Sequence, residues 1–91
     1  MKCQIIGKNI VVTDSIRAAV ESKLARMEKY FIINEEVTAK ILCRTYKTAQ
    51  KVEITINTKM MDFRVEVMHD DLYAAIDLAI DKLEGQMRKL K

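Results

Sequence analysis

The sequence predicts one α+β domain with the element order β-α-β-β-β-α, in which a four-stranded mixed sheet forms one layer and two helices cover one of its faces. Three segments in the middle of the chain alternate apolar and polar residues, as strands with one solvated face do. One segment before them and one after them repeat apolar residues every three or four positions, as amphipathic helices do. With 91 residues, 49% of them hydrophobic, and no proline, the chain has material for one small core. We therefore expect residues 1–91 to form a single domain.

The first strand is expected over residues 2–7, where Gly7 closes it. A helix of about four to five turns is expected from Thr13 to about Phe31. Either Thr13 or Asp14 is placed to cap its free amide groups. Its apolar residues, at spacings of four, four, three and four, are Ile16, Val20, Leu24, Met27 and Phe31.

Three further strands follow this helix. Their apolar residues are Val37, Ala39, Ile41 and Cys43, then Val52, Ile54 and Ile56, then Phe63, Val65 and Val67. The residues between them are polar and include Lys40, Arg44, Glu53, Thr55, Arg64 and Glu66. After Asp70 and Asp71, which favour a helix start, a second helix is expected to run to the end of the chain. Its apolar stripe is Leu72, Ile76, Ala79, Ile80, Leu83, Met87 and Leu90.

The element order constrains the sheet. Two strands joined by a helix pair in parallel through a right-handed crossover, whereas short connections between the later strands suit antiparallel pairing. Both helices then cover the apolar face of the sheet. The opposite face stays open and carries Lys40, Arg44, Lys51 and Arg64. The layout is similar to that of double-stranded-RNA-binding domains, which is an analogy of fold and carries no function by itself.

Composition bounds the function. Sixteen Lys and Arg residues against 13 Asp and Glu give a net charge of +3, which solubility alone explains. No stretch approaches about 18 consecutive apolar residues and the first residues lack a secretory signal, so we expect a cytoplasmic protein with no membrane span. Cys3 and Cys43 are expected as buried, reduced thiols. The sequence has no CxxC motif or Cys/His cluster, and we expect no metal site.

Charged residues are sorted by side on both predicted helices when residues are placed at steps of about 100° around the axis. The acidic side holds Glu21 and Glu28 in the first helix, and Asp77, Asp81 and Glu84 in the second. The basic side holds Lys23, Arg26 and Lys29 in the first helix, and Lys82 and Lys89, with Gly85 between them, in the second. The repetition of one layout in two helices favours a polyanion-binding surface over an ordinary solvated face. Whether the two basic sides merge depends on how the helices pack.

Enzymatic functions fit the sequence poorly. Its two glycines form no phosphate-binding loop of the GxxxxGK or GxGxxG type. His69 ends a predicted strand, where a capping contact is favoured over acid–base catalysis, which needs a positioned partner. Packing is likewise favoured over nucleophilic chemistry for Cys3 and Cys43, and a charged helix face over a reactive pair for Asp77 and Asp81. We therefore expect no enzyme activity and no cofactor.

Three stretches carry a family resemblance: IIGKNIVVTDSIRAAVESKLARMEKYF, KVEITINT and HDDLYAAIDLAIDKLEGQMRKLK. The chain resembles the ribosome hibernation promoting factor family, also known as ribosome-associated inhibitors and as sigma-54 modulation proteins. The helix start VT-x-x-I-R-x-x-V-x-x-K-L combined with DLYAAID and KLExQ is the most specific part of the match. The resemblance implies a β-α-β-β-β-α fold and a non-catalytic cytoplasmic protein. Such proteins occupy the channel of the small ribosomal subunit where mRNA and the A-site and P-site tRNAs sit, and so silence translation in stationary phase or stress.

The resemblance also implies an interface with RNA. Its partner is the small ribosomal subunit and its 16S rRNA within the 70S ribosome, with no small-molecule substrate and no membrane. Carried over by position, the rRNA-binding residues are Lys8 in the loop before the first helix, Lys23, Arg26 and Lys29 in that helix, and Lys82, Arg88 and Lys89 in the second helix. The helical angles agree with this set except at Arg88, which lies off the basic side and equally suits the helix macrodipole.

The chain departs from the family pattern in two ways. Family members usually carry Arg or Lys within KLExQ where this chain has Gly85, which removes one expected phosphate contact. Glycine there is explained either by close approach of RNA to the backbone or by drift at a position that lost its arginine. The length resembles a short family member or the N-terminal domain of a longer one, with no C-terminal dimerisation domain. Dimerising ribosomes would then need a partner factor or that missing domain.

One alternative of another class stays open at this point. A two-layer α+β module can serve protein interaction or regulation, docking an acidic protein through the open sheet face or through the tip at Met60 and Met61. Binding that falls steeply with salt and depends on the helix lysines would favour RNA. Binding that is insensitive to salt and depends on the two methionines would favour a protein partner.

Overall fold

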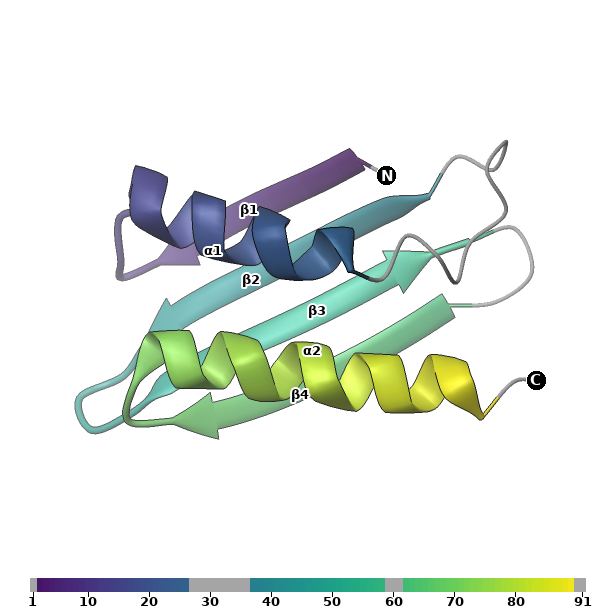
Figure 1. The fold of residues 1–91 in the computed structure, drawn as a ribbon. Coiled ribbons are helices and arrows are strands. Elements are labelled where there is room, and N and C mark those ends of the chain that lie inside the picture. The colour runs from purple at the N-terminus through teal and green to yellow at the C-terminus, as the bar shows by residue number, and fades with distance from the viewer. Residues whose placement is uncertain (1, 27–36, 59–61, 90–91) are drawn as a thin grey trace.

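The computed structural model of the protein describes residues 2–26, 37–58 and 62–89, and in this part of the chain it has the predicted two-layer α+β architecture (Figure 1). The elements are β1 (Lys2–Lys8), α1 (Asp14–Ala25), β2 (Thr38–Thr45), β3 (Gln50–Asn57), β4 (Asp62–His69) and α2 (Leu72–Arg88). The order β-α-β-β-β-α confirms the fold class that the periodicities predict. Neither described helix has the length and apolar content that crossing a membrane requires.

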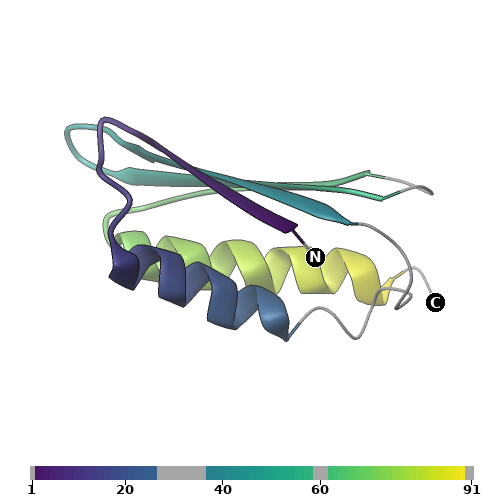
Figure 2. The same ribbon diagram turned by 90° about the horizontal axis from the view of Figure 1, so that it is seen from above.

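The four strands form one mixed sheet in the order β1-β2-β3-β4. The pair β1 and β2, joined through α1, is parallel, and the two later pairs are antiparallel. Figure 2 shows both helices on the same face of the sheet, so that the other face is left uncovered. The mixed topology therefore agrees with the rule that a helical crossover joins parallel strands while short connections join antiparallel ones.

The core lies between the sheet and the helices, and strand alternation decides which residues enter it. Alternate residues of β2, β3 and β4 are buried, except at Thr45, Gln50 and His69 at the strand ends, because successive side chains of a strand point to opposite faces. The predicted apolar set is buried throughout: Val37, which directly precedes β2, and the strand residues Ala39, Ile41, Cys43, Val52, Ile54, Ile56, Phe63, Val65 and Val67. The helices bury Ile16, Val20, Leu24, Ala75, Ile76, Ala79, Ile80, Leu83 and Met87. The described part of the chain buries no polar or charged residue.

Both helices begin at side-chain caps. The Thr13 hydroxyl accepts a hydrogen bond from the Ile16 N–H at 3.2 Å, so Thr13 and not Asp14 is the N-cap of α1. Asp71 caps α2 by accepting from the Tyr73 N–H at 3.0 Å. The His69 ring nitrogen Nδ1 in turn accepts from the Asp71 N–H at 3.0 Å, which is the capping contact that the sequence favours for this histidine.

The two cysteines lie on neighbouring strands and on the same side of the sheet. Cys3 pairs with Ala39 across β1 and β2, and Cys43 pairs with Gly7. Cys43 is buried, and burial raises the pKa of its thiol, which disfavours the reactive thiolate. Cys3 is half-buried against the core rather than fully buried as expected. Both positions serve packing.

Three element ends differ from the prediction, and one of them is the end of α2, which lies at Arg88 and not at the end of the chain. β1 continues to Lys8, so Lys8 belongs to a strand and not to a loop, because its backbone extends the parallel ladder to Arg44. The structure ends α1 at Ala25, whereas the sequence predicts an end near Phe31. The predicted stripe residues Met27, Phe31 and Leu90, the tip methionines Met60 and Met61, and the terminal Lys91 fall outside the described residues.

A candidate nucleic-acid interface

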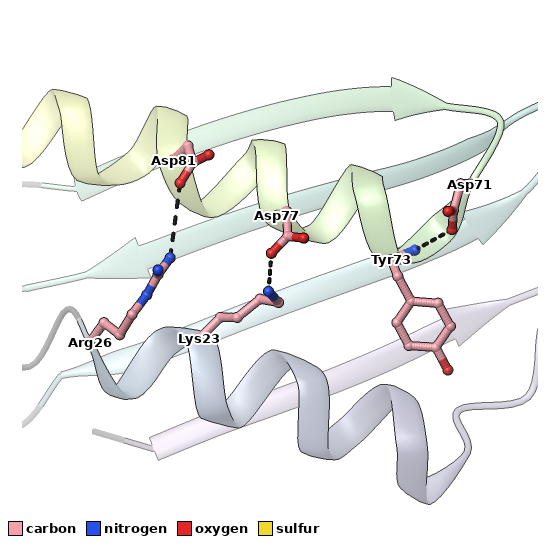
Figure 3. Close-up of polar contacts among 6 residues, drawn as sticks. All are labelled: Lys23, Arg26, Asp71, Tyr73, Asp77 and Asp81. Carbon is pink, nitrogen blue, oxygen red and sulfur yellow. Dashed lines mark hydrogen bonds and ion pairs between the residues drawn. The ribbon is translucent and has the colours of Figure 1, made fainter.

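The two helices run in parallel, side by side, across the sheet (Figure 1). Lys23 of α1 forms an ion pair with Asp77 of α2, and the Arg26 guanidinium lies 3.9 Å from an Asp81 carboxylate oxygen (Figure 3). Both carboxylates belong to the acidic side of α2. We call this line of contact, made by Lys23, Arg26, Asp77 and Asp81, the helix seam.

The helix seam follows from the charge layout that both helices share. Each helix carries basic residues on one side of its apolar stripe and acidic residues on the other. Viewed along the axis from the N-terminus, the two sides follow each other in the same order in both helices. When two such helices lie parallel, the basic side of one must face the acidic side of the other. The basic sides of α1 and α2 therefore do not merge into one patch. This answers the question that the sequence leaves open.

Pairing at the helix seam changes what its cations can do. Exposed ion pairs contribute at most about 1 kcal/mol, so they do little for stability. Lys23 is nevertheless the more sheltered of the two cations, with 30% of its side chain exposed against 57% for Arg26. Two cations and two carboxylates carry no net charge together. An approaching polyanion meets far less attraction here than unpaired cations would give.

The outer flank of α2 is different, because its cations are not offset. Lys82 and Lys89 are both exposed, and within residues 2–26, 37–58 and 62–89 no carboxylate pairs with either of them. Seven residues of helix separate them by roughly 10 Å along the axis. Between them a Cβ on Gly85 would have no neighbouring heavy atom within 4 Å. This flank is an open cationic strip.

Two further residues of the predicted interface, Arg88 and Lys8, do not join the strip. Arg88 lies beside Glu84, one turn earlier in α2, with a guanidinium nitrogen 3.3 Å from the carboxylate. Its position near the C-terminal end also complements the helix macrodipole. Lys8 lies at the end of β1 and faces the uncovered side of the sheet, away from both helices. Lys29 lies outside the described residues.

The uncovered face of the sheet also carries charged residues. On its β3–β4 half, the Lys51 ammonium lies 3.1 Å from Glu53 and 3.0 Å from Glu66, and Arg64 lies 3.8 Å from Glu53. The hydrogen bond between Lys51 and Glu66 raises the pKa of Lys51 and lowers the pKa of Glu66. Both shifts favour the charged forms of Lys51 and Glu66, and the two cations and two carboxylates of this network offset one another.

The β1–β2 half of the same face carries Lys8, Lys40 and Arg44, and no carboxylate among the described residues compensates them. Strand register is the signal that could have identified this cluster from the sequence, because the parallel ladder sets Lys8 opposite Arg44. A sequence reading that treats the positions singly does not bring Lys8 to this face. Four groups of charged residues are thus distinguished: the neutral helix seam, the cationic strip of α2, the compensated network on the β3–β4 half of the open sheet face, and the cationic β1–β2 half of that face.

Comparison with known proteins finds relatives of the chain in both sequence and structure. A family model described as sigma 54 modulation protein / S30EA ribosomal protein matches residues 3–91. A ribosome hibernation promotion factor of Lactococcus lactis subsp. cremoris is 42% identical over the whole chain, and one of Staphylococcus aureus is 41% identical. The matches cover 50% and 48% of those two proteins, so the chain spans about half the length of the curated relatives it matches.

Solved structures match the fold over nearly its full extent. The N-terminal domain of Protein Y from Thermus thermophilus aligns with a TM-score of 0.90 at 38% identity, and the alignment covers all of both chains. A ribosomal subunit interface protein from Coxiella burnetii aligns with a TM-score of 0.85 at 23% identity, covering 99% of this chain and 97% of the other. The second likeness bears on the fold alone.

Proposed function

The chain belongs to the sigma 54 modulation protein / S30EA ribosomal protein family, and we propose that it is a cytoplasmic ribosome hibernation factor that acts without catalysis. It binds the 16S rRNA of the small subunit within the 70S ribosome and occupies the channel used by mRNA and by A-site and P-site tRNAs. Translation stops because the channel is filled. The observation that carries the proposal is the cationic strip of α2, on a chain whose relatives are named for ribosome hibernation.

The cations of the interface differ in how readily each reaches a phosphate. Lys82 and Lys89 bind phosphate first, since no carboxylate in the described ranges competes for them. Lys23, Arg26 and Arg88 bind phosphate only when it replaces or shares their carboxylate partners. Lys29 is retained in the interface by its position in the family pattern, and Lys8 meets RNA from the opposite face of the domain.

The carboxylates give this interface its selectivity. Asp77 and Asp81 repel phosphates that approach the helix layer from above the helix seam, while the outer flank of α2 attracts them. A uniformly basic helix layer would bind any nucleic acid in several orientations. If about six cations meet phosphates, the logarithm of the binding constant should fall with the logarithm of salt with a slope of roughly −4 to −5.

Sedimentation with purified small subunits tests the function directly. We expect the protein to pellet with the subunits at low salt, and added initiator tRNA to release it, because the two compete for one channel. A protein that stays in the supernatant would contradict ribosome binding. A protein that pellets equally well with saturating tRNA would contradict the proposed position in the channel.

Neutralising the helix seam carboxylates is expected to tighten RNA binding. Asp77→Asn with Asp81→Asn raises the net charge from +3 to +5 and leaves Lys23 and Arg26 without these partners. Each further phosphate that the variant binds should steepen the salt slope by about 0.7 to 0.9, with a several-fold higher affinity at low salt. The measurement is a salt titration of small-subunit binding for wild type and variant.

A matched control separates this effect from the change in net charge. Glu21→Gln with Asp62→Asn also removes two exposed carboxylates, but neither of them lies at the helix seam. We expect this control to change affinity and slope less than the helix seam variant does. Equal effects from both variants would mean that Lys23 and Arg26 take no specific part in binding.

A further inference from the structure

The uncovered face of the sheet has one cationic half, formed by β1 and β2. Cys3 and Ile5 of β1 pack against the core, so the intervening Gln4, Ile6 and Lys8 occupy the uncovered side. In β2 the buried residues Ala39, Ile41 and Cys43 alternate in the same way with Lys40, Leu42 and Arg44. Lys8, Lys40 and Arg44 are exposed. We call these three residues the sheet cations.

The sheet cations form a defined arrangement. Lys8 and Arg44 are partners in the parallel ladder and therefore lie on adjacent strands at one end of the face. Lys40 lies four residues before Arg44, roughly 13 Å along the same strand. The half-buried pair Ile6 and Leu42 fills the space between them. The face thus offers positive charge at both ends of a shallow apolar stretch.

Two further observations separate this half from an ordinary solvated surface. Within the described ranges no carboxylate pairs with a sheet cation, whereas the β3–β4 half holds two cations and two carboxylates in one network. The Arg44 guanidinium also lies over the Tyr46 ring, 5.0 Å from its centroid. A guanidinium plane held over an aromatic ring is a platform on which an unpaired base can stack.

We propose that the β1–β2 half of the uncovered sheet face is a second RNA-binding surface, which takes a single-stranded RNA segment with its phosphates on Lys8, Lys40 and Arg44. This inference rests on the proposed function and deepens it. The cationic strip of α2 and the sheet cations belong to opposite layers of the domain (Figure 2). The domain therefore binds RNA on both of its layers and lies between two RNA segments, rather than resting on a single RNA surface.

The geometry favours RNA over an acidic peptide. A peptide strand that added to the free edge of β1 would extend the sheet in its own plane, with its side chains next to those of β1. Lys40 and Arg44 lie one strand further in and would be largely out of its reach. A nucleic acid lying across the face reaches all three cations and can place a base against Arg44. The arrangement of charge and stacking surface therefore fits a polynucleotide.

The test begins with a short single-stranded RNA, so that it does not depend on ribosome binding. A hexanucleotide is titrated into the isotope-labelled protein and amide chemical shifts are followed. We expect shifts in β1 and β2 as well as along α2, and we expect Lys40→Gln with Arg44→Gln to abolish those in β1 and β2 while retaining those in α2. Shifts confined to α2 would overturn the proposal. The proposal would also be overturned if polyglutamate of the same total charge as the RNA caused equal chemical-shift changes in β1 and β2, since the surface would then bind acidic proteins equally well.

Binding to small subunits then measures how much the sheet cations contribute to ribosome affinity. The sheet variant, Lys40→Gln with Arg44→Gln, should weaken binding about tenfold and reduce the magnitude of the salt slope by roughly 1.4 to 1.8, the value for two bound phosphates. The control, Arg17→Gln with Arg64→Gln, removes two cations that already have carboxylate partners, and should change both quantities less. Equal effects of the two variants would overturn the proposal. A wild-type protein that fails to bind subunits would refute the proposed function, and the hexanucleotide titration would still decide whether the surface binds RNA.

Discussion

Reversing the charge of Lys82 and Lys89 together is expected to weaken binding to the small subunit about 100-fold. Each reversal removes an attraction to phosphate and adds a repulsion, and a tenfold loss per residue corresponds to about 1.4 kcal/mol. These two lysines have the largest expected effect because no carboxylate of the described residues shields them. The salt slope should also fall in magnitude by roughly 1.4 to 1.8. Co-sedimentation across a range of salt concentrations measures both quantities.

The fold should survive this double reversal. Both side chains are exposed and contribute nothing to the core. Glutamate at position 89 faces the negative end of the α2 macrodipole, which costs about 0.3 to 1 kcal/mol, a small part of the stability of a domain this size. Arg17→Glu makes one such charge reversal, half the change of the double variant, on the far flank of α1, and should leave subunit binding nearly unchanged. Undiminished co-sedimentation of the Lys82→Glu/Lys89→Glu protein would contradict the proposed interface.

Local pattern is enough to predict the strands, the helix starts and the core of this domain. Alternation in β2, β3 and β4 has a period of two, and one buried face enforces it strictly, so every predicted core residue of these strands is buried. The stripes of α1 and α2 have helical spacing for the same reason, and the described members of each stripe contact the core. Such features depend on neighbours within one element, which a sequence displays directly.

The proposed interface depends on contacts between residues of different elements, which the sequence predicts less well. The sorted charges of each helix are visible in it, but only the spacing and direction of α1 and α2 show that Lys23 meets Asp77 and Arg26 meets Asp81. The sequence also predicts a loop at Lys8, because Gly7 resembles a strand end, whereas pairing with β2 carries β1 one residue further. Register across strands, rather than any local motif, brings Lys8 to the uncovered face.

Replacing Gly7 with alanine is expected to destabilise the domain by about 2 kcal/mol, because a new Cβ has no room. It would lie 3.0 Å from Val12 Cγ2 and closer still to the carbonyl oxygen of Ile10. That oxygen belongs to the backbone of the short connection that leads into the Thr13 cap, so relief requires the connection to shift. The φ angle of Gly7 is not positive, and close approach of the chain is therefore the reason for glycine at this position.

The other glycine supplies the matched comparison, because Gly85→Ala is expected to stabilise the domain by about 1 kcal/mol. A Cβ at Gly85 meets nothing within 4 Å, and alanine removes the entropic cost of glycine inside a helix. Thermal unfolding measures both variants, at about 4 to 8 °C in Tm for each kcal/mol in a domain of this size. We expect Gly7→Ala to melt roughly 8 to 16 °C lower and Gly85→Ala roughly 4 to 8 °C higher than wild type. Shifts of the same sign would show that helix propensity and close packing are not what distinguishes the two positions.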